Sequence, residues 1–410
     1  MELITLSLVN FRNYAQREFK FDSGVSVMVG KNTAGKTNLL EAVYLLATGE
    51  SFREGKIEEM VNWEGEVGHV VGKVSPQQIL NPKSEILNND KISNSNDQNE
   101  IGLQVSLTRG VVQGGRVSKR RYLVNGVPRS RQKLLGNLVV VCFRPEDMRI
   151  VEGSPGRRRN FLDGVLVQVD PEYGRSLGSY SRGLVRRNKV LQMIREGRTN
   201  RTALAFWDQL VVKEGMVIQD RRREVCDFFN RFKVQGLRLE NEGEDFFDSL
   251  KVEYRPSVMS EKRLAQYEYE EVAAGHTLVG PHRDDFGIIA KNPNYKLQIT
   301  KQAQNSRPKA DQPMAENIKY KNEQGRDLAI YGSRGEQRLG VLWLKLMSME
   351  YVEHKLGVRP VLLLDDIFSE LDSAHRKLVW GVVGRQQTIV TTADENQVGS
   401  LIDGYKLMRL

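Results

Sequence analysis

The segment Gly30–Asn38 constrains the fold of this chain more than any other. It reads GKNTAGKTN, which fits the pattern G-x-x-x-x-G-K-[ST]. The β-branched stretch Gly24–Gly30 precedes it and predicts a strand. Apolar residues spaced by three and four predict a helix from about Gly35 to Ala47, which Thr48–Gly49 ends. A strand, a glycine-rich loop and a helix in this order favour a phosphate-binding loop over a chance glycine turn.

A loop of this kind binds phosphate oxygens because backbone N–H groups and the positive end of the helix dipole face the ligand. Gly30 and Gly35 allow the close turn. Lys36 places a positive charge at the β- and γ-phosphates, and Thr37 supplies a hydroxyl to Mg²⁺. We therefore expect ATP and Mg²⁺ here, with the ATP-binding residues Gly30, Lys31, Asn32, Thr33, Ala34, Gly35, Lys36, Thr37 and Asn38.

A second feature is the acidic end of an apolar segment, VLLLDDIFSELD (Val361–Asp372). A buried strand that ends in carboxylates is the usual way in which phosphate-loop proteins hold Mg²⁺. Asp365 is therefore the candidate metal ligand together with Thr37, and Asp366 is a candidate to orient or deprotonate the attacking water. The candidate catalytic residues are Lys36, Asp365 and Asp366. The alternative is a strand that ends in a solvated acidic turn.

Lys36 and Asp365 stand 329 positions apart, more chain than a compact nucleotide-binding domain needs between these two parts. Most of the intervening chain must leave the domain and return, and the long helical patterns of 157–272 fit that description. The expected fold class is α/β: an ABC-type P-loop ATPase head of mixed sheets and helices, split by an inserted α-helical arm. We expect head segments at 1–156 and 273–410, with flexible surface insertions at 76–100 and 301–326.

The segment YGSRGEQR (Tyr331–Arg338) resembles the ABC signature loop and precedes a helix expected from about Gly335 to Lys355. Such a loop binds the γ-phosphate of ATP held by another subunit, so that ATP stabilises a dimer of two copies. A capping box, in which the first and last of the four signature positions cap the helix, is the alternative. The candidate signature residues are Ser333, Arg334, Gly335 and Glu336.

The chain carries 61 Lys and Arg against 52 Asp and Glu, an excess that permits a polyanionic partner. Arginines on one face of the expected arm would bind DNA backbone without sequence preference, although a solvated face paired with carboxylates is the alternative for any single cluster. No apolar run reaches the roughly 18 residues of a membrane span, and two cysteines outside any CxxC pattern indicate a reducing compartment. The candidate DNA-binding residues are Arg182, Arg186, Arg187, Arg221 and Arg222.

Further segments of the chain form a specific set of motifs. They are LVNFRNY (Leu8–Tyr14), GKNTAGKTNLLEA (Gly30–Ala42), GESFR (Gly49–Arg53), FRPEDMRIVEGSPGRRRNFLD (Phe143–Asp163), GHTLVGPHRDDF (Gly275–Phe286), SRGEQR and LLLDDIFSELD. General ABC transporter ATPases do not carry the combination of GSPGRRRNFLD with GPHRDD. With these segments the chain resembles the RecF recombination-mediator family over nearly its whole length.

The resemblance implies an ATP-dependent DNA-binding protein of recombinational DNA repair and replication restart that forms a homodimer on binding ATP. Family members act at single-strand/double-strand junctions and gapped DNA, where they help to load recombinase through partners called RecO and RecR. The resemblance also implies a cytoplasmic, nucleoid-associated protein. Within the first matching segment, Arg12 and Asn13 are further candidate ATP-binding residues.

Several positions differ from related patterns. Thr33 stands where the family usually has glycine, and a positive φ there would strain a β-branched residue. Asp366 stands where ABC proteins have a catalytic glutamate, and its shorter side chain suits slow hydrolysis with ATP acting mainly as a switch. We interpret Arg157–Arg159 as structural, and GPHRDD (Gly280–Asp285) as a hydrogen-bonding part of the head core.

Two other classes of protein remain open. An ABC-type transport ATPase subunit would need a membrane partner and a glutamate after Asp365, and the long helical insertion counts against it. A small-molecule phosphotransferase would use the same loop but would need a compact acceptor pocket and fast turnover.

Overall fold

The computed structural model describes residues 1–31, 33–53, 55–75, 100–232, 246–291, 325–369, 373–394 and 404–410. The expected insertions at 76–100 and 301–326 lie outside the described residues, apart from position 100 and positions 325–326. Asn32 of the phosphate loop also lies outside them.

The chain divides into two compact units. Unit 1 comprises Met1–Glu146, Asp163–Ser179 and Ser348–Leu410, and unit 2 comprises Asp147–Leu162 and Tyr180–Met347. The expected arm falls mostly in unit 2, which also takes residues up to Met347, so the boundaries at 156 and 272 remain a prediction. Three helices have residues in both units: α4 (Pro155–Val169), α5 (Pro171–Arg195) and α12 (Arg334–Leu356).

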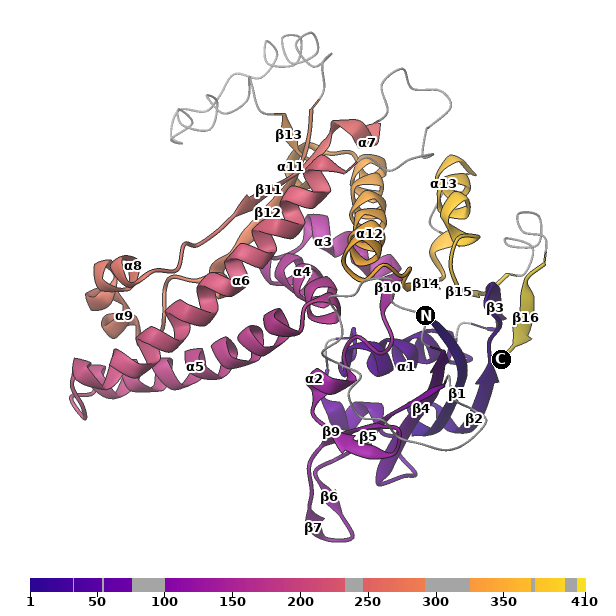
Figure 1. Ribbon diagram of the computed structural model, residues 1–410, viewed down its shortest axis with the longest axis horizontal. Coiled ribbons are helices and arrows are strands. Elements are labelled where there is room, and N and C mark those ends of the chain that lie inside the picture. Colours follow the sequence, from indigo (N-terminus) through magenta and orange to yellow (C-terminus); the bar gives the residue numbers. More distant parts are fainter. Residues whose placement is uncertain are drawn as a thin grey trace, which may run out of the picture. The chain divides into compact units, whose positions relative to one another are not determined.

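Unit 1 contains a five-stranded parallel sheet in the order β10-β14-β15-β3-β16 (Figure 1). β14 and β15 are buried along their whole length, as expected of strands covered on both faces. The carboxyl ends of parallel strands meet at one edge of a sheet, and ligands bind at that edge. The strands are β10 (Val140–Phe143), β14 (Val361–Asp365), β15 (Thr388–Thr392), β3 (Val25–Val29) and β16 (Lys406–Arg409).

A six-stranded antiparallel sheet forms the rest of the framework of unit 1, in the order β2-β1-β4-β5-β8-β9. Helix α1 (Lys36–Thr48) contributes Leu39, Val43 and Leu46 to one apolar core with residues of both sheets. The helix ends at Gly49, which has a φ of +71°. The strands are β1 (Glu2–Phe11), β2 (Tyr14–Lys20), β4 (Val67–Ser75), β5 (Ile101–Thr108), β8 (Arg120–Val124) and β9 (Val127–Arg129).

Short elements complete unit 1. A two-stranded hairpin of β6 (Val111–Val112) and β7 (Gly115–Arg116) lies between β5 and β8 in the chain. The other elements are η1 (Ile57–Met60), α2 (Arg131–Leu134), η7 (Ile367–Ser369) and α13 (Ser373–Val383).

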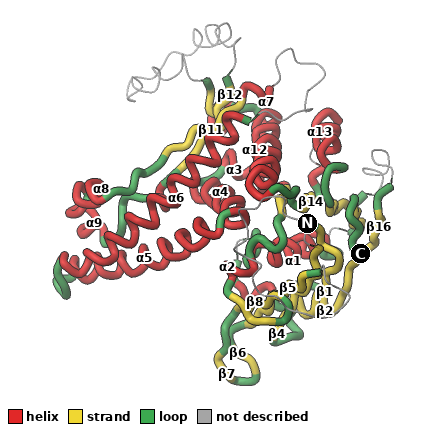
Figure 2. Tube along the Cα trace, viewed as in Figure 1, coloured by secondary structure: helices red, strands yellow, loops and turns green. Residues whose placement is uncertain are grey.

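Unit 2 is built on two long helices, α5 and α6 (Ala205–Arg231), which run in opposite directions and spread apart from the end where the chain joins them (Figure 2). Buried Val211, Ile218 and Val225 of α6 recur at helical spacing and form the core face of that helix. A three-stranded antiparallel sheet, β11-β12-β13, packs beside α6. The strands are β11 (Leu250–Arg255), β12 (Asp285–Ala290) and β13 (Arg326–Asp327).

The remaining elements of unit 2 are short helices. They are α3 (Arg149–Glu152), η4 (Arg201–Leu204), α7 (Phe246–Ser249), α8 (Glu261–Gln266), α9 (Glu268–Ala274), η5 (Pro281–Arg283) and α11 (Leu328–Tyr331). One further turn, η3 (Pro145–Met148), begins in unit 1 and ends in unit 2.

Candidate nucleotide-binding site

The phosphate loop lies between β3 and α1, as its sequence predicts. Gly35 has a φ of +101°, and a Cβ there would lie 2.6 Å from Asn13 Nδ2 and 2.8 Å from the Tyr14 hydroxyl, so only glycine fits. Thr33 is not among the described non-glycine residues with a positive φ, so the strain that would accompany a positive φ does not arise.

Lys36 is buried inside the loop. Its ammonium donates to the carbonyl oxygens of Gly30 at 2.5 Å and Lys31 at 3.1 Å. The loop therefore holds a positive charge, enclosed by its own backbone, at the start of α1. This arrangement suits an incoming phosphate, because the charge and the helix N–H groups are already in place.

Asp365 lies at the end of β14 and faces the first turn of α1. Its Oδ1 accepts a hydrogen bond from Thr37 Oγ1 at 3.1 Å and from Thr391 Oγ1 at 2.8 Å. Only 4% of Asp365 is exposed, and burial raises the pKa of its carboxyl, while the two threonine hydrogen bonds oppose that rise. A hydroxyl and a carboxylate in contact are suitable oxygen donors for Mg²⁺, so the residues fit this cation.

Asp366 follows in a left-handed conformation, with a φ of +49°. Its backbone N–H donates to the carbonyl oxygen of Thr391 at 3.0 Å and to the Oγ1 atom at 3.2 Å. Thr391 thus hydrogen-bonds to both aspartates and fixes the turn between them. The catalytic role of Asp366 remains a prediction.

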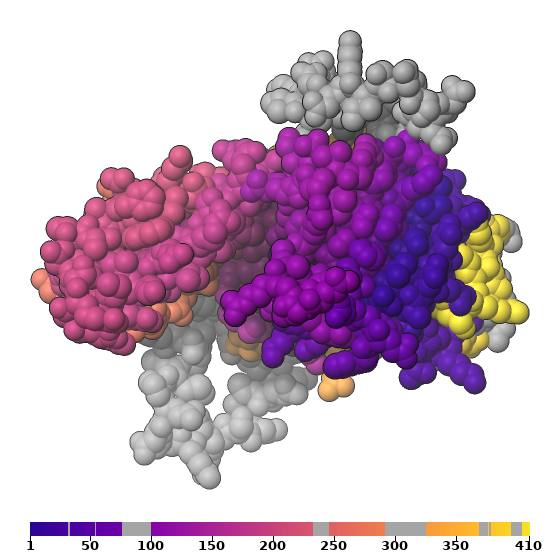
Figure 3. Space-filling view, turned by 90° about the horizontal axis from the view of Figure 1, so that it is seen from below, coloured from indigo at the N-terminus to yellow at the C-terminus, as the bar shows by residue number. Residues whose placement is uncertain are grey.

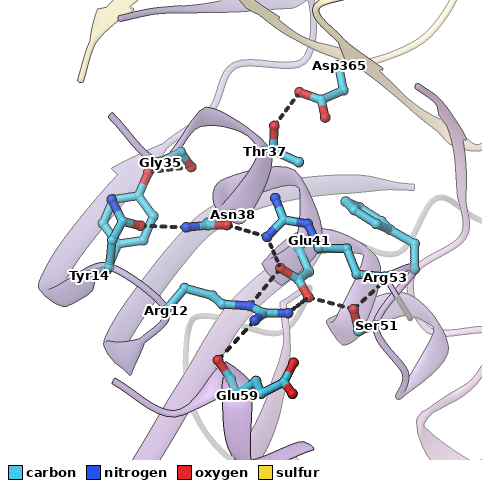
Figure 4. A network of polar contacts seen from close by, with 12 residues as sticks. Arg12, Tyr14, Gly35, Thr37, Asn38, Glu41, Ser51, Arg53, Glu59 and Asp365 are labelled. Carbon is cyan, nitrogen blue, oxygen red and sulfur yellow. Dashed lines mark hydrogen bonds and ion pairs between the residues drawn. The ribbon is translucent and has the colours of Figure 1, made fainter. Parts of the chain in front are cut away.

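A cluster of polar contacts surrounds Glu41, one turn along α1 from Thr37 (Figure 4). Glu41 is fully buried, and Arg12 binds it through two hydrogen bonds, Nε to Oε2 at 3.0 Å and Nη2 to Oε1 at 2.6 Å. Ser51 donates to Oε1 at 2.5 Å, and Arg53 lies 3.3 Å from Oε2. Segments around 12, 41 and 51–53 therefore meet at one carboxylate. We call this group the Glu41 cluster.

The cluster continues to the phosphate loop. Arg53 Nη1 donates to Asn38 Oδ1 at 2.7 Å, and Asn38 Nδ2 donates to Asn13 Oδ1 at 2.8 Å. Asn13 Nδ2 in turn reaches the carbonyl oxygen of Ala34 at 3.3 Å. The predicted ATP-binding residue Asn13 thus contacts the loop itself, whereas Arg12 is bound to Glu41 beside it.

Sequence reasoning did not assign a role to Glu41, Ser51 or Arg53. The segment GESFR contributes only to the family resemblance, and Glu41 stands within the apolar pattern of α1. A carboxylate inside an otherwise apolar helical face is the signal that could have identified it, because buried charges require partners.

The signature residues lie at the start of α12 in unit 2. Glu336 N–H donates to Ser333 Oγ at 3.3 Å, and Ser333 N–H donates to Glu336 Oε2 at 2.8 Å. This reciprocal pair is the capping box that the sequence left open as the alternative. Ser333, Arg334 and Gly335 are nevertheless exposed, so capping and display of the serine at the surface are compatible.

GPHRDD forms a hydrogen-bonded polar network in unit 2, as expected of its hydrogen-bonding role, and its assignment to the head core stays a prediction. Asp284 is 1% exposed. Its carboxylate accepts hydrogen bonds from Arg222 Nη1 at 3.1 Å and Gln219 Nε2 at 2.8 Å. Tyr254 OH donates at 2.5 Å and the Ser257 N–H at 2.8 Å to the same carboxylate. We call this group the Asp284 cluster.

Arg158 and Arg159 join the same region, as the structural interpretation of that motif predicts. Arg158 forms a two-point ion pair with Asp285 at 2.6 and 3.0 Å. Arg159 Nη1 donates to the carbonyl oxygen of Asp284 at 2.7 Å.

Two of the five candidate DNA-binding arginines are buried, which is a correction. Arg187 is 2% exposed and lies 2.7 Å from carboxylate oxygens of both Asp208 and Glu271. Arg222 belongs to the Asp284 cluster, so neither guanidinium is available to DNA. Helical spacing alone does not separate a solvated cation from one that is paired inside. Among the other candidates, Arg182 and Arg186 are exposed, and Arg221 lies 3.5 Å from Glu224.

None of the helices in the described part of the chain is both long and apolar enough to cross a membrane.

Comparison with known proteins places the chain in a family. The family described as RecF/RecN/SMC N terminal domain matches residues 2–408. The DNA replication and repair protein RecF of Halothermothrix orenii is 32% identical over 96% of this chain and 92% of its own length. The RecF protein of Herpetosiphon aurantiacus is also 32% identical, over 96% of this chain and 94% of its own length.

Solved structures agree with the sequence relatives. The recombination mediator protein RecF-ATPrS in the RecFOR pathway has a TM-score of 0.75 at 26% identity, over 100% of this chain and 96% of that one. A RecF-ATP structure has a TM-score of 0.74 at 26% identity, over 97% and 93% of the two chains. The expected fold class, an ATPase head of mixed helices and sheets, is thereby confirmed. The chain belongs to the RecF family, within the wider RecF/RecN/SMC N-terminal domain group.

Proposed function

We propose that this protein is an ATP-dependent DNA-binding protein of recombinational DNA repair and replication restart. The hydrogen bond between Thr37 and Asp365 carries the proposal, because it joins the phosphate loop to the metal-binding strand end. Relatives that match almost the whole chain carry RecF names, and two matching RecF structures are named with ATP or ATPrS. These likenesses favour RecF chemistry over a transport ATPase or a phosphotransferase.

The nucleotide would lie on the phosphate loop, with Lys36 at the β- and γ-phosphates. Thr37 and Asp365 would hold Mg²⁺, which would supply positive charge to the phosphates. Asp366 would orient the attacking water, and its short side chain suits slow hydrolysis. ATP would therefore act mainly as a switch.

The signature loop would complete the site from a second copy of the chain. Ser333 and Gly335 are exposed at the start of a 23-residue helix, whose N–H groups favour anions. A loop of this kind on one copy would meet the γ-phosphate on the other. ATP then stabilises the homodimer by mass action.

DNA is the proposed macromolecular ligand, in the form of gapped DNA with single-strand/double-strand junctions. Exposed Arg182 and Arg186 of α5 remain candidate contacts to the DNA backbone. The RecFOR name of the structural relatives supports partners of the RecO and RecR type. Such a protein would act in the cytoplasm on the nucleoid.

The test is binding of a fluorescent gapped duplex with ATP and Mg²⁺ or with ADP and Mg²⁺. ATP should tighten binding at least about tenfold over ADP, if dimerisation forms the DNA-binding state. Lys36→Ala should weaken ATP binding at least about tenfold and remove the ATP effect, because it deletes a charged phosphate contact.

Lys56→Ala is the matched control, since this exposed lysine lies outside the loop. Equal DNA affinity with ATP and ADP, or an Lys36→Ala variant that behaves like the control, contradicts the proposal.

A further inference from the structure

The positive charge of this protein is concentrated in one continuous segment of unit 1. Residues 101–145 contain nine Lys or Arg and no Asp or Glu. The formal net charge of the whole chain is +9, so the remaining 365 residues are balanced. A local excess of this size attracts a polyanion more strongly than charges spread over the surface.

The β6–β7 hairpin lies within this segment, and its backbone forms a regular turn and closing hydrogen bonds. Gln113 and Gly114 have φ values of +49° and +76°, as a tight two-residue hairpin turn requires. Val117 N–H donates to the Gly110 carbonyl oxygen at 3.0 Å, and Thr108 N–H donates to that of Lys119 at 3.0 Å. Figure 1 shows the hairpin projecting from the six-stranded sheet, and Figure 3 shows its purple atoms at the surface.

Carboxylates from other segments compensate some of these cations, but not all of them. Lys119 pairs with Glu58, and Arg120 lies 3.8 Å from Glu50. Arg116 and Arg121 are exposed, and neither forms an ion pair with any residue that the structure describes.

Two more carboxylates, Glu64 and Glu66, lie on the neighbouring loop, and Glu66 Oε2 accepts a hydrogen bond from Gln113 N–H at 3.2 Å. Glu66 therefore contacts the turn of the hairpin. Arg116 of β7 and Arg121 of the following strand β8 therefore remain exposed cations without an ion pair in the described residues.

An exposed tryptophan lies at the base of the hairpin. Trp63 is 88% exposed, and the guanidinium of Arg109 lies 5.5 Å from its ring centroid. Arg109 is held there by hydrogen bonds to the carbonyl oxygens of Gly65 at 2.8 Å and Asn62 at 2.9 Å. A tryptophan with this exposure keeps most of its ring surface accessible to a ligand.

We propose that the β6–β7 hairpin, the start of β8 and Trp63 form a DNA-binding surface for a single-strand/double-strand junction. Arg116 and Arg121 bind backbone phosphates, to which guanidinium groups donate in a two-point geometry. Trp63 stacks on an unpaired base, because an aromatic ring beside cations is the usual platform for single-stranded DNA. This inference rests on the proposed DNA binding and assigns it to a surface.

The first test measures affinity for fluorescent gapped DNA with ATP. The double variant Arg116→Glu/Arg121→Glu should weaken binding at least about tenfold, and the slope of log affinity against log salt should become shallower by about 2. Arg17→Glu/Lys20→Glu is the control, with the same charge change on β2, an edge strand of the six-stranded sheet. The control should bind within about threefold of the unmodified protein.

The second test compares gapped DNA with a fully paired duplex of the same length. Trp63→Ala should weaken binding to gapped DNA by about tenfold and leave duplex binding within twofold, since stacking on one base contributes about 1–3 kcal/mol. ATP affinity and the melting temperature of each variant should match those of the unmodified protein.

The possible failures differ. If the unmodified protein binds gapped DNA but the hairpin and control variants bind equally well, the hairpin assignment is overturned and the proposed function stands. If the unmodified protein binds no DNA with ATP, both are overturned. A Trp63→Ala variant that loses duplex and gapped binding equally contradicts base stacking.

Discussion

Two buried carboxylates organise the two units in different ways. Glu41 in unit 1 and Asp284 in unit 2 are almost fully buried, and arginine and uncharged donors bind each of them. The partners of Glu41 lead outward, through half-buried Arg53 and Asn38, to the phosphate loop. Those of Asp284 all belong to unit 2: Arg222 and Gln219 are buried, and Tyr254 and Ser257 are half-buried.

The difference indicates that burial of a charge does not by itself mark a functional site. A closed network stabilises its own unit, whereas one that ends beside a ligand loop can also set the position of that loop. We therefore expect changes at Asp284 to act on stability and changes at Glu41 to act on nucleotide binding as well.

The largest effect should follow from Asp284→Ala. It leaves the Arg222 guanidinium and three other donors without their shared acceptor, and breaking a buried ion pair costs about 3–5 kcal/mol. Urea denaturation should show this loss in the free energy of unfolding. Asp220→Ala, an exposed carboxylate of α6 paired only with Arg223 in the described residues, is the control and should change it by less than about 0.5 kcal/mol. Similar small losses in the free energy of unfolding for both variants would show that the Asp284 cluster does not stabilise unit 2.

The pH dependence of the free energy of unfolding should show whether water is excluded from the buried polar network of unit 2. His282 Nδ1 lies 2.7 Å from Tyr180 OH, and Nε2 lies 3.2 Å from the Thr277 carbonyl oxygen. Burial lowers the pKa of His282 from 6.5 to about 4. The hydrogen bond to the Thr277 carbonyl and the charge of Asp284 oppose this lowering, and the charges of Arg283 and Arg159 add to it.

Because the folded pKa is depressed, the unfolded chain binds more protons between pH 6.5 and 4. The contribution of neutral His282 to the free energy of unfolding is therefore fully present above pH 6.5 and is lost as the pH falls through about 4. The loss amounts to at most about 3 kcal/mol. Unfolding curves at several pH values should be flatter for His282→Gln, whereas exposed His276→Gln should keep the dependence of the unmodified protein. An identical slope in all three proteins would mean that water reaches His282 freely.

A smaller loss of stability should follow from Glu41→Gln. The amide keeps the shape but removes the charge that Arg12 and Arg53 share, so the free energy of unfolding should fall by about 1–3 kcal/mol. ATP affinity, measured by calorimetry, should fall about tenfold because Arg53 no longer holds Asn38 beside the loop. Glu59→Gln, an exposed neighbour, should change neither. Unchanged ATP affinity in Glu41→Gln would mean that Glu41, like Asp284, affects stability alone, which would contradict the difference drawn between the two carboxylates.

The phosphate loop and the acidic strand end were predictable because each has a strict local pattern next to a regular element. The bounds of α1 and α12 also follow closely from apolar spacing and from the positive-φ glycines Gly49 and Gly357. These features depend on neighbours within a few residues in the sequence, which is the range that a pattern reports.

Pairings between distant segments were not predictable. Trp63 and Arg109 are 46 positions apart, and no local pattern brings them together. The burial of Arg187 likewise depends on Glu271, which reaches it from a different helix. Helical periodicity shows which residues share a face but does not show whether an acidic partner covers that face.

The central claim is that Ser333 of one copy completes the ATP-binding site on the phosphate loop of another copy. Sedimentation velocity of the full chain, with ATP and Mg²⁺ or with ADP and Mg²⁺, tests it most directly. The account predicts a dimer with ATP, a monomer with ADP, and a Ser333→Arg variant that binds ATP but stays monomeric. A single unchanged species at saturating ATP, or a Ser333→Arg variant that dimerises like the unmodified protein, would contradict it.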